Sequence, residues 1–191
     1  MSIVYLNGEF LPKEEAKISP QDRGFLFGDA VYEAIPFYQG KPFGMELHWK
    51  RLQDGLGFMR IPFDETQESF LQICENLLAK NQFDQKATIM SMIYLQISRG
   101  TSMTRHHLFP KPEANNGATV KPTVYAFLQE INYPSKERWN QGFTAALVPD
   151  RRWDRVDIKT VNLLPNVLAF QDAKEQGADE CILVKDGVAM E

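Results

Sequence analysis

Two long apolar runs constrain the fold of this chain most strongly. Residues 87–100, ATIMSMIYLQISRG, and residues 121–131, KPTVYAFLQEI, are rich in β-branched and aromatic side chains. Such side chains favour the pleated surface of a strand, and we expect both runs to be central strands of one antiparallel sheet. The loop between them, residues 109–122, is rich in Pro, Gly and Asn. A loop of that length is either functional or mobile.

Shorter patterns add strands and helices to this sheet. An Asn-Gly pair at residues 7–8 and a Gln-Gly pair at residues 39–40 each separate two strand-like segments, and Asn-Gly is a strong hairpin signal. Apolar residues at helical spacing predict helices over about 46–57 and 65–80. We therefore expect an α+β domain over residues 1–131, with an antiparallel sheet and flanking helices.

A change in composition around INYPSKERWNQG predicts a linker, followed by a second domain over residues 135–191. The predicted elements of this domain are strands over 143–150, 152–159 and 180–184 and a helix over 165–176. An Asp-Gly turn then leads into VAME, an outgoing strand. Because such a domain would expose a strand edge, we expect the chain to be part of a longer polypeptide or to pair with a complementary C-terminal chain.

Charge and cysteine content exclude several classes of partner. The chain carries 21 Lys and Arg against 25 Asp and Glu, a formal charge of −4, which gives no general attraction to nucleic acid or anionic membranes. Cys74 and Cys181 lack the spacing of a disulfide framework or a zinc site and fit a reducing cytoplasm. Neither a signal peptide nor an apolar run of roughly 20 residues is present. We expect a cytoplasmic protein with neither nucleic acid nor membrane as partner.

Common catalytic motifs are absent from the sequence. It contains no P-loop, no dinucleotide-binding glycine motif, no zinc-peptidase motif and no nucleophile elbow. The three histidines, His48, His106 and His107, have no identifiable acidic partners. Adjacent histidines on a strand point to opposite faces, so we expect no metal site.

Lys159 is the first candidate for chemistry. If residues 152–159 form a strand, Arg155, Asp157 and Lys159 share one face, and Lys159 precedes an apolar helix start. A lysine with a partly desolvated amine loses its proton more easily and becomes a Schiff-base nucleophile. The alternative is an exposed strand end or an ion pair with Asp157. Periodicity alone favours that alternative, because structural ion pairs are common.

A second group of donors lies in RGTSMTRHH, residues 99–107. The planar fork of arginine donates two parallel hydrogen bonds to a carboxylate, and a neighbouring imidazole adds a third donor. The alternative is a solvated loop without a ligand. Arg51, on a predicted helix, is a candidate for binding a phosphate, although helix arginines are usually surface charge. Tyr32, on its predicted strand, is by default a core or interface aromatic.

Six segments resemble, in order and nearly in spacing, the class IV (fold type IV) pyridoxal-phosphate-dependent aminotransferases. They are NGEFLP, DRGFLFGDAVYEAI, HWKRL, SRGTS, DIKTVNLL and GADECILVKDGVAME. The resemblance covers essentially the whole chain and implies a two-domain fold whose C-terminal cofactor domain is incomplete at Glu191. It implies that Lys159 is catalytic and bonds covalently to pyridoxal 5'-phosphate, that Arg51 contacts the cofactor phosphate, and that Glu191 pairs with the pyridine nitrogen. Arg152 and Glu180 would be nearby supports.

Within this family the sequence is most similar to the D-amino-acid aminotransferases. That group carries an R-x-H motif after the R-G-T-S turn, which here is Arg105-His106-His107. The resemblance implies that Tyr32, Arg105 and His107 bind the substrate α-carboxylate, with Arg105 and His107 reaching in from the other subunit of a homodimer. One extra residue between Ser102 and Arg105, and a longer insertion in the loop that follows, depart from the pattern of the group.

The implied activity is transfer of an amino group between a D-amino acid, such as D-alanine, and a 2-oxo acid. We expect residues 1–191 alone to be inactive, because the family places further phosphate-binding loops later in its sequence. Two alternatives keep the fold, a branched-chain L-amino-acid aminotransferase and an aminodeoxychorismate lyase, and the R-x-H motif disfavours both. A third is a catalytically silent binding module made from half of such a fold. Lys159, Arg51 and Glu191 argue against it, and the missing C-terminal region argues for it.

Overall fold

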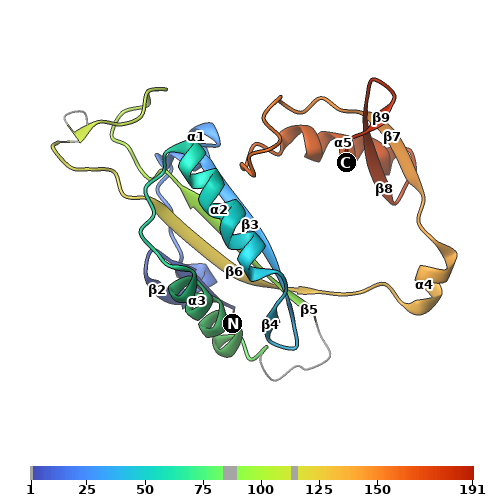
Figure 1. The fold of residues 1–191 in the computed structure, drawn as a ribbon, viewed down its shortest axis with the longest axis horizontal. Coiled ribbons are helices and arrows are strands. Elements are labelled where there is room, and N and C mark those ends of the chain that lie inside the picture. The colour runs from blue at the N-terminus through green and yellow to red at the C-terminus, as the bar shows by residue number, and fades with distance from the viewer. Residues whose placement is uncertain (1, 84–89, 113–115) are drawn as a thin grey trace. The chain divides into compact units, whose positions relative to one another are not determined.

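The chain divides into two units in the structure, a computed structural model that describes residues 2–83, 90–112 and 116–191 (Figure 1). The first unit contains Met1–Asn132 together with Ile158–Val161, and the second contains Tyr133–Asp157 and Asn162–Glu191. The sequence predicts one boundary between residues 131 and 135. The short segment that contains Lys159, however, returns to the first unit.

A six-stranded antiparallel sheet forms the first unit, in the order β2-β1-β6-β5-β3-β4. β5 and β6 pair along their whole length inside this sheet, so the prediction that the two apolar runs are central strands is confirmed. Residues 87–89 of the first run lie outside the described residues. The strands are β1 (Ile3–Leu6), β2 (Glu9–Pro12), β3 (Ala30–Tyr38), β4 (Lys41–Pro42), β5 (Met90–Ser98) and β6 (Thr123–Ile131).

Both predicted hairpins are confirmed. The β1-β2 turn has φ 51° at Asn7 and 99° at Gly8, and the β3-β4 turn has φ 51° at Gln39 and 73° at Gly40. Positive φ at both central residues of a two-residue turn matches the right-handed twist of the flanking strands. Because β4 pairs only with the last two residues of β3, the first part of β3 is left at the edge of the sheet.

Two long helices cover one face of this sheet (Figure 1). α2 (Met45–Met59) packs on β3, and α3 (Gln67–Lys80) packs on β1 and β6, so both predicted helices are confirmed. Leu52 and Leu56 of α2 join Val31 and Ile35 of β3 in the core. Across the described residues, no helix combines the length and apolar character needed to cross a membrane. Two short helices, η1 (Lys13–Glu15) and α1 (Arg23–Phe27), complete the unit.

The second unit is a small α/β arrangement. Its elements are α4 (Lys136–Gln141), β7 (Ala145–Pro149), α5 (Leu164–Glu175), β8 (Glu180–Lys185) and β9 (Val188–Ala189). β7 and β8 are parallel, α5 packs on both, and β9 pairs antiparallel with β8. The helix predicted over 165–176 is confirmed, with Gly177 at φ 77° just past its end, where glycine is favoured. The predicted linker contains α4.

The predicted strand over residues 152–159 is wrong. This segment forms turns and irregular structure, and only the following residue, Thr160, makes an isolated antiparallel bridge, to Val31. Asp150 Oδ1 accepts a hydrogen bond from the backbone N–H of Arg152 at 2.9 Å. Such a local bond offers the backbone an alternative to a sheet ladder, so the expected arrangement of alternating faces does not form.

Candidate functional site

Lys159 is fixed beside the first residues of β3. Its backbone oxygen accepts a hydrogen bond from the N–H of Tyr32 at 3.0 Å. The Lys159 Nζ lies 3.2 Å from the Tyr32 hydroxyl and 4.2 Å from the centre of the Tyr32 ring, and the lysine is half-buried. Asp157 pairs with Arg155, at 2.7 Å, so the alternative of an ion pair between Lys159 and Asp157 is wrong.

Tyr32 lies on the sheet face opposite the helices. Its neighbours in β3, Val31 and Glu33, are buried toward α2, and side chains alternate between the faces of a strand. The Tyr32 ring stacks on Tyr94 with centroids 5.6 Å apart, and Tyr94 lies 5.1 Å from Phe127. Burial raises the pKa of Tyr94 to about 12, so its hydroxyl stays neutral. An uncharged aromatic surface therefore adjoins the Lys159 amine.

Arg51 is oriented by a buried carboxylate that the sequence analysis missed. Its Nε and Nη2 donate to Glu33 Oε1 and Oε2 at 2.6 and 2.7 Å, and His48 Nδ1 lies 2.8 Å from Oε2. The Glu33 side chain is 1% exposed whereas that of Arg51 is 49% exposed. The hydrogen bonds that Arg51 donates to Glu33 raise the pKa of Arg51, and Tyr32 adds a smaller effect in the same direction. A charged, oriented and accessible guanidinium results, which suits a phosphate.

The side chains of Arg105 and His107 both lie against the aromatic ring of Phe27, in α1. The Arg105 guanidinium lies 5.1 Å from the Phe27 ring centre, and the His107 ring lies edge-on at 5.5 Å. His106 instead accepts a hydrogen bond at Nδ1 from the Leu108 N–H, 3.1 Å away. Within the described residues, no hydrogen bond or ion pair joins Arg105 or His107 to Tyr32. Nor does any group of three or more His, Cys, Asp and Glu in that part of the chain suit a metal ion.

Arg152 and Glu191 come together in the second unit. Arg152 Nε and Nη2 donate to Asp150 at 3.0 and 2.8 Å, and Nη1 pairs with the Glu191 carboxylate. These hydrogen bonds, donated by Arg152 and accepted by Asp150, lower the pKa of Asp150 and raise the pKa of Arg152. Arg152 therefore stays charged and orients Glu191. Glu180, at the start of β8, is exposed, and among the described residues no side-chain hydrogen bond or ion pair of Glu180 supports its expected role.

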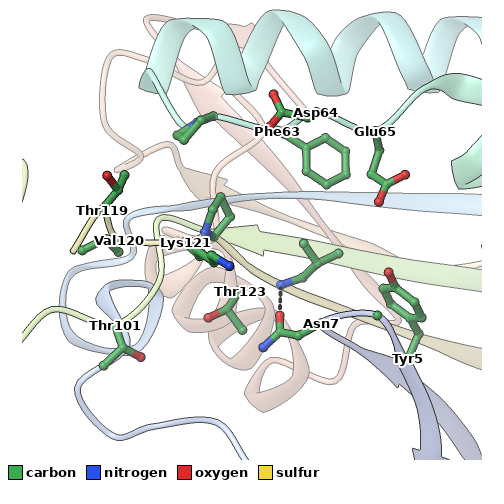
Figure 2. Close-up of a pocket in the computed structure, with 14 residues that line it drawn as sticks. Tyr5, Asn7, Phe63, Asp64, Glu65, Thr101, Thr119, Val120, Lys121 and Thr123 are labelled. Atoms are coloured by element: carbon green, nitrogen blue, oxygen red, sulfur yellow. Dashed lines mark hydrogen bonds between the residues drawn. The ribbon is translucent and has the colours of Figure 1, made fainter.

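A separate pocket of about 790 Å³ lies by the β1-β2 turn (Figure 2). Residues 62–65 and 119–124 form most of its remaining wall, and Asn7 Oδ1 accepts a hydrogen bond from the Val124 N–H at 2.8 Å beside it. None of the site residues predicted from the sequence lines this pocket. A smaller cavity of about 430 Å³ lies in the loop of Arg105 and His106.

Comparisons with known proteins agree with the fold and the motifs. The profile of the amino-transferase class IV family matches residues 30–191. A D-alanine aminotransferase from Staphylococcus haemolyticus is 38% identical over 182 residues, which are 95% of this chain and 60% of that protein. The predicted similarity to D-amino-acid aminotransferases is thereby confirmed.

Solved structures share the fold at low sequence identity. A branched-chain aminotransferase from Thermoproteus uzoniensis, solved with norvaline, has a TM-score of 0.75 at 20% identity, over 97% of this chain and 60% of that one. A hypothetical aminotransferase from Mycobacterium tuberculosis in its PLP-bound form has a TM-score of 0.71 at 20% identity, over 97% and 62%. The chain thus spans about three fifths of the length of these relatives. It belongs to the amino-transferase class IV family.

Proposed function

We propose that the protein is a pyridoxal-phosphate-dependent D-amino-acid aminotransferase that moves an amino group between D-alanine, or a similar D-amino acid, and a 2-oxo acid. One observation carries the proposal: the half-buried Lys159 amine lies 3.2 Å from the Tyr32 hydroxyl in a chain of the class IV family. The 38% identity to a D-alanine aminotransferase supports the choice of substrate.

The described residues fit pyridoxal phosphate. Arg51 donates to Glu33 through Nε and Nη2. Among the described contacts, Glu33 does not use Nη1 of this half-exposed guanidinium, so Nη1 can donate to a phosphate oxygen. Lys159 would bond to the cofactor aldehyde. Glu191, oriented by Arg152, would supply the carboxylate for the pyridine nitrogen. An amine, a guanidinium and a carboxylate are the groups that the three polar ends of this cofactor need.

Proton transfer is the part of the reaction that falls to Lys159. When bound, pyridoxal phosphate supplies a ring that accepts electron density from the substrate Cα. Lys159 Nζ acts as the general base that takes the Cα proton and later returns it. The hydrogen bond to the Tyr32 hydroxyl holds Nζ in position. A Glu191 carboxylate paired with the ring nitrogen would favour the protonated form of that nitrogen.

We propose further that the enzyme is a homodimer in which Arg105 and His107 of one subunit bind the α-carboxylate of a substrate at Lys159 of the other. Residues 103–109 of their loop are all exposed, with the large apolar side chain of Leu108 69% exposed. A carboxylate held by this loop and a base at Lys159 together select which face of Cα presents its proton. That geometry would set the preference for one enantiomer.

Assay of the complete gene product tests the proposed function. D-alanine and its enantiomer L-alanine yield the same product, pyruvate, with 2-oxoglutarate as acceptor, so only stereochemistry differs between the two reactions. We expect pyruvate from D-alanine, and a change in the absorption of the bound cofactor when D-alanine is added. Activity with L-leucine and none with D-alanine would instead indicate a branched-chain L-amino-acid aminotransferase. Absence of any cofactor absorption would indicate a silent binding module.

A further inference from the structure

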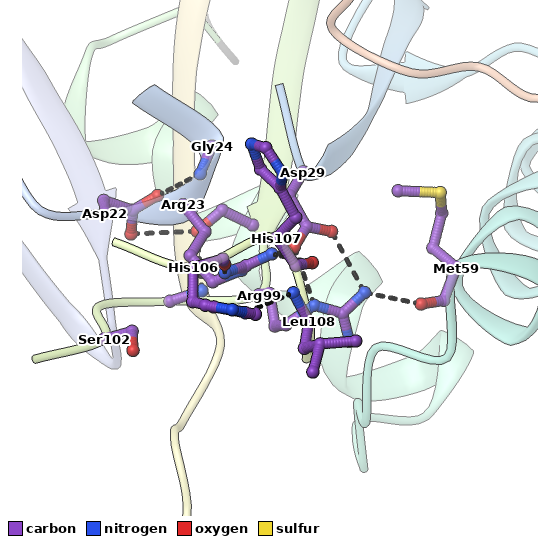
Figure 3. A network of polar contacts seen from close by, with 12 residues as sticks. Asp22, Arg23, Gly24, Asp29, Met59, Arg99, Ser102, His106, His107 and Leu108 are labelled. Carbon is purple, nitrogen blue, oxygen red and sulfur yellow. Dashed lines mark hydrogen bonds and ion pairs between the residues drawn. The ribbon is translucent and has the colours of Figure 1, made fainter. Parts of the chain in front are cut away.

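A buried charge network lies beneath the loop that carries Arg105 and His107 (Figure 3). Asp29 accepts hydrogen bonds from Arg23 Nε at 2.7 Å and from Arg99 Nε and Nη2 at 2.8 and 3.0 Å. Both arginines are buried, 3% and 5% exposed. Burial alone would raise the pKa of Asp29, but the hydrogen bonds from Arg99 and Arg23 outweigh it and lower that pKa. Two cations around one anion leave a positive charge that needs further acceptors.

The further acceptors of the two arginines are backbone carbonyls in two different segments of the chain. Arg99 donates through Nη1 and Nη2 to two backbone carbonyls at the C-terminal end of α2, at 2.9 and 2.7 Å. Arg23 Nη1 donates to the His106 carbonyl at 2.7 Å, and its Nη2 lies 3.4 Å from the His107 carbonyl oxygen. Arg99 therefore ties the network to a helix, and Arg23 ties it to the loop.

The N-terminal end of α1, where Arg23 lies, is hydrogen-bonded to the sheet and to the residues that follow it. The Arg23 N–H donates to the Gly100 carbonyl at 2.9 Å. Asp22, the N-cap of α1, accepts from Ser98 Oγ at 2.9 Å and from Thr123 Oγ1 at 2.6 Å. In contrast to the start of α1, residues 103–109 of the loop are all exposed. The bonds from Arg23 to the loop carbonyls thus restrain a segment that has few buried contacts of its own.

We propose that Arg23 is a positioning residue for the substrate carboxylate: clamped on Asp29, it holds the loop backbone at His106 and His107 so that the Arg105 and His107 side chains are presented in fixed positions. This inference rests on the proposed function, in which those two side chains bind the carboxylate. Arg23 acts through the loop and does not touch the substrate. Loss of the restraint lowers the fraction of loop competent to bind, and the apparent affinity falls by that fraction.

Two variants separate this role from a general role in folding. Arg23→Gln removes the bonds to the loop but leaves Asp29 with its bidentate, charge-balanced partner Arg99, so the core should persist. Arg23→Lys keeps the charge but lacks the fork that reaches Asp29 and a loop carbonyl together. Arg138→Gln is the matched control, because Arg138 also donates to a carboxylate and a backbone carbonyl, but in the second unit.

The experiment compares ligands with and without a carboxylate on the complete holoenzyme. D-alaninol has an alcohol where D-alanine has its carboxylate, and propionate has the carboxylate without the amine. For Arg23→Gln we expect the KM for D-alanine, and the Kd for propionate measured by calorimetry, to rise by about 10- to 100-fold. The kcat should change far less than KM, and the D-alaninol concentration for half of the cofactor absorbance change should stay the same. Arg23→Lys should show a smaller rise, and Arg138→Gln none.

Equal weakening of D-alanine and D-alaninol would overturn the proposal, because it would show a general structural defect. An unchanged KM for D-alanine in both Arg23 variants, with a raised KM in Arg105→Gln, would overturn it while leaving the proposed function intact. An unchanged KM in Arg105→Gln would instead remove the carboxylate site from the proposed function, and the inference with it. If Arg23→Gln does not fold, the same comparison with Arg23→Lys decides.

Discussion

Glu33 is the residue that turns an ordinary helix arginine into a candidate phosphate ligand. It is fully buried, yet it accepts hydrogen bonds from Arg51, whose side chain is half exposed. The sequence offered Arg51 as a candidate for binding a phosphate, but only the resemblance favoured that role, because a helix arginine is usually surface charge. The signal that was available is the glutamate itself, at an inward position of the apolar strand AVYEAIPF. A buried carboxylate needs a cation, and α2 supplies it.

Replacement of this carboxylate should weaken cofactor binding. In Glu33→Gln one amide oxygen replaces two acceptors, and the amide N–H group points at the donors of Arg51 and His48. We expect the Kd for pyridoxal phosphate to rise by about 10- to 100-fold, measured by absorption during titration of the apoenzyme. The control is Glu46→Gln, at an exposed position in the first turn of α2, the helix that carries Arg51. Equal cofactor affinity in both variants would show that Glu33 does not orient the phosphate ligand.

Elements were predictable wherever a local pattern repeats. The two hairpins, the central strands and the three long helices follow from turn residues and apolar spacing, and all are confirmed. α1 was missed because it has five residues, and its boundaries depend on the cap at Asp22 and the positive φ of Gly28. The strand predicted over 152–159 was wrong, and at its start the Asp150 side chain accepts a hydrogen bond from the backbone N–H of Arg152, which a sheet ladder would otherwise use. Pairing across distance, as between Asp29 and Arg99, leaves no local signal.

Asp29 supplies the carboxylate that both buried arginines, Arg23 and Arg99, bind. Asp29→Asn leaves two buried guanidiniums without a carboxylate, so we expect the free energy of unfolding at pH 7 to fall by about 3–5 kcal/mol. The folded-state pKa of Asp29 lies below its ordinary value. Its contribution is therefore complete above about pH 4 and is lost as the pH falls through the folded-state pKa.

Denaturant unfolding of both proteins at pH 7 and at pH 3 measures this contribution. The stability difference between wild type and Asp29→Asn should shrink at the lower pH. Asp54→Asn removes an exposed pair with Lys50 and serves as control, with an expected change below about 1 kcal/mol. A wild-type advantage over Asp29→Asn that is equal at both pH values would mean that the ionised carboxylate is not its source.

At the scale of the whole molecule, the residues that the proposed function uses come from three separate parts of the chain. Lys159, Tyr32 and Arg51 belong to the first unit, and Arg152 and Glu191 to the second. The loop of Arg105 and His107, which we propose binds the substrate carboxylate, is exposed and has no hydrogen bond or ion pair to Tyr32 within the described residues. The sequence indicated these parts by resemblance, since no local pattern can show which subunit a loop serves.

A shared active site can be tested by mixing inactive subunits. Co-expression of Lys159→Ala with Arg105→Gln should give mixed dimers in which one site carries both substitutions and the other carries neither. About a quarter of wild-type activity should then return. Co-expression of Lys159→Ala with Glu191→Gln is the control, because both substitutions fall in the site of their own subunit and no intact site forms. Activity equal to the sum of the separate variants would place Arg105 in the site of its own subunit.

The covalent partner of the cofactor is the most direct measurement of all. The complete holoenzyme is reduced with borohydride and digested, and the peptides are identified by mass spectrometry, with Lys185→Ala as a control lysine variant. The predicted result is a phosphopyridoxyl group on Lys159, and loss of both this group and the visible absorption band in Lys159→Ala. A phosphopyridoxyl group on another lysine, with Lys159 unmodified, would contradict the assignment.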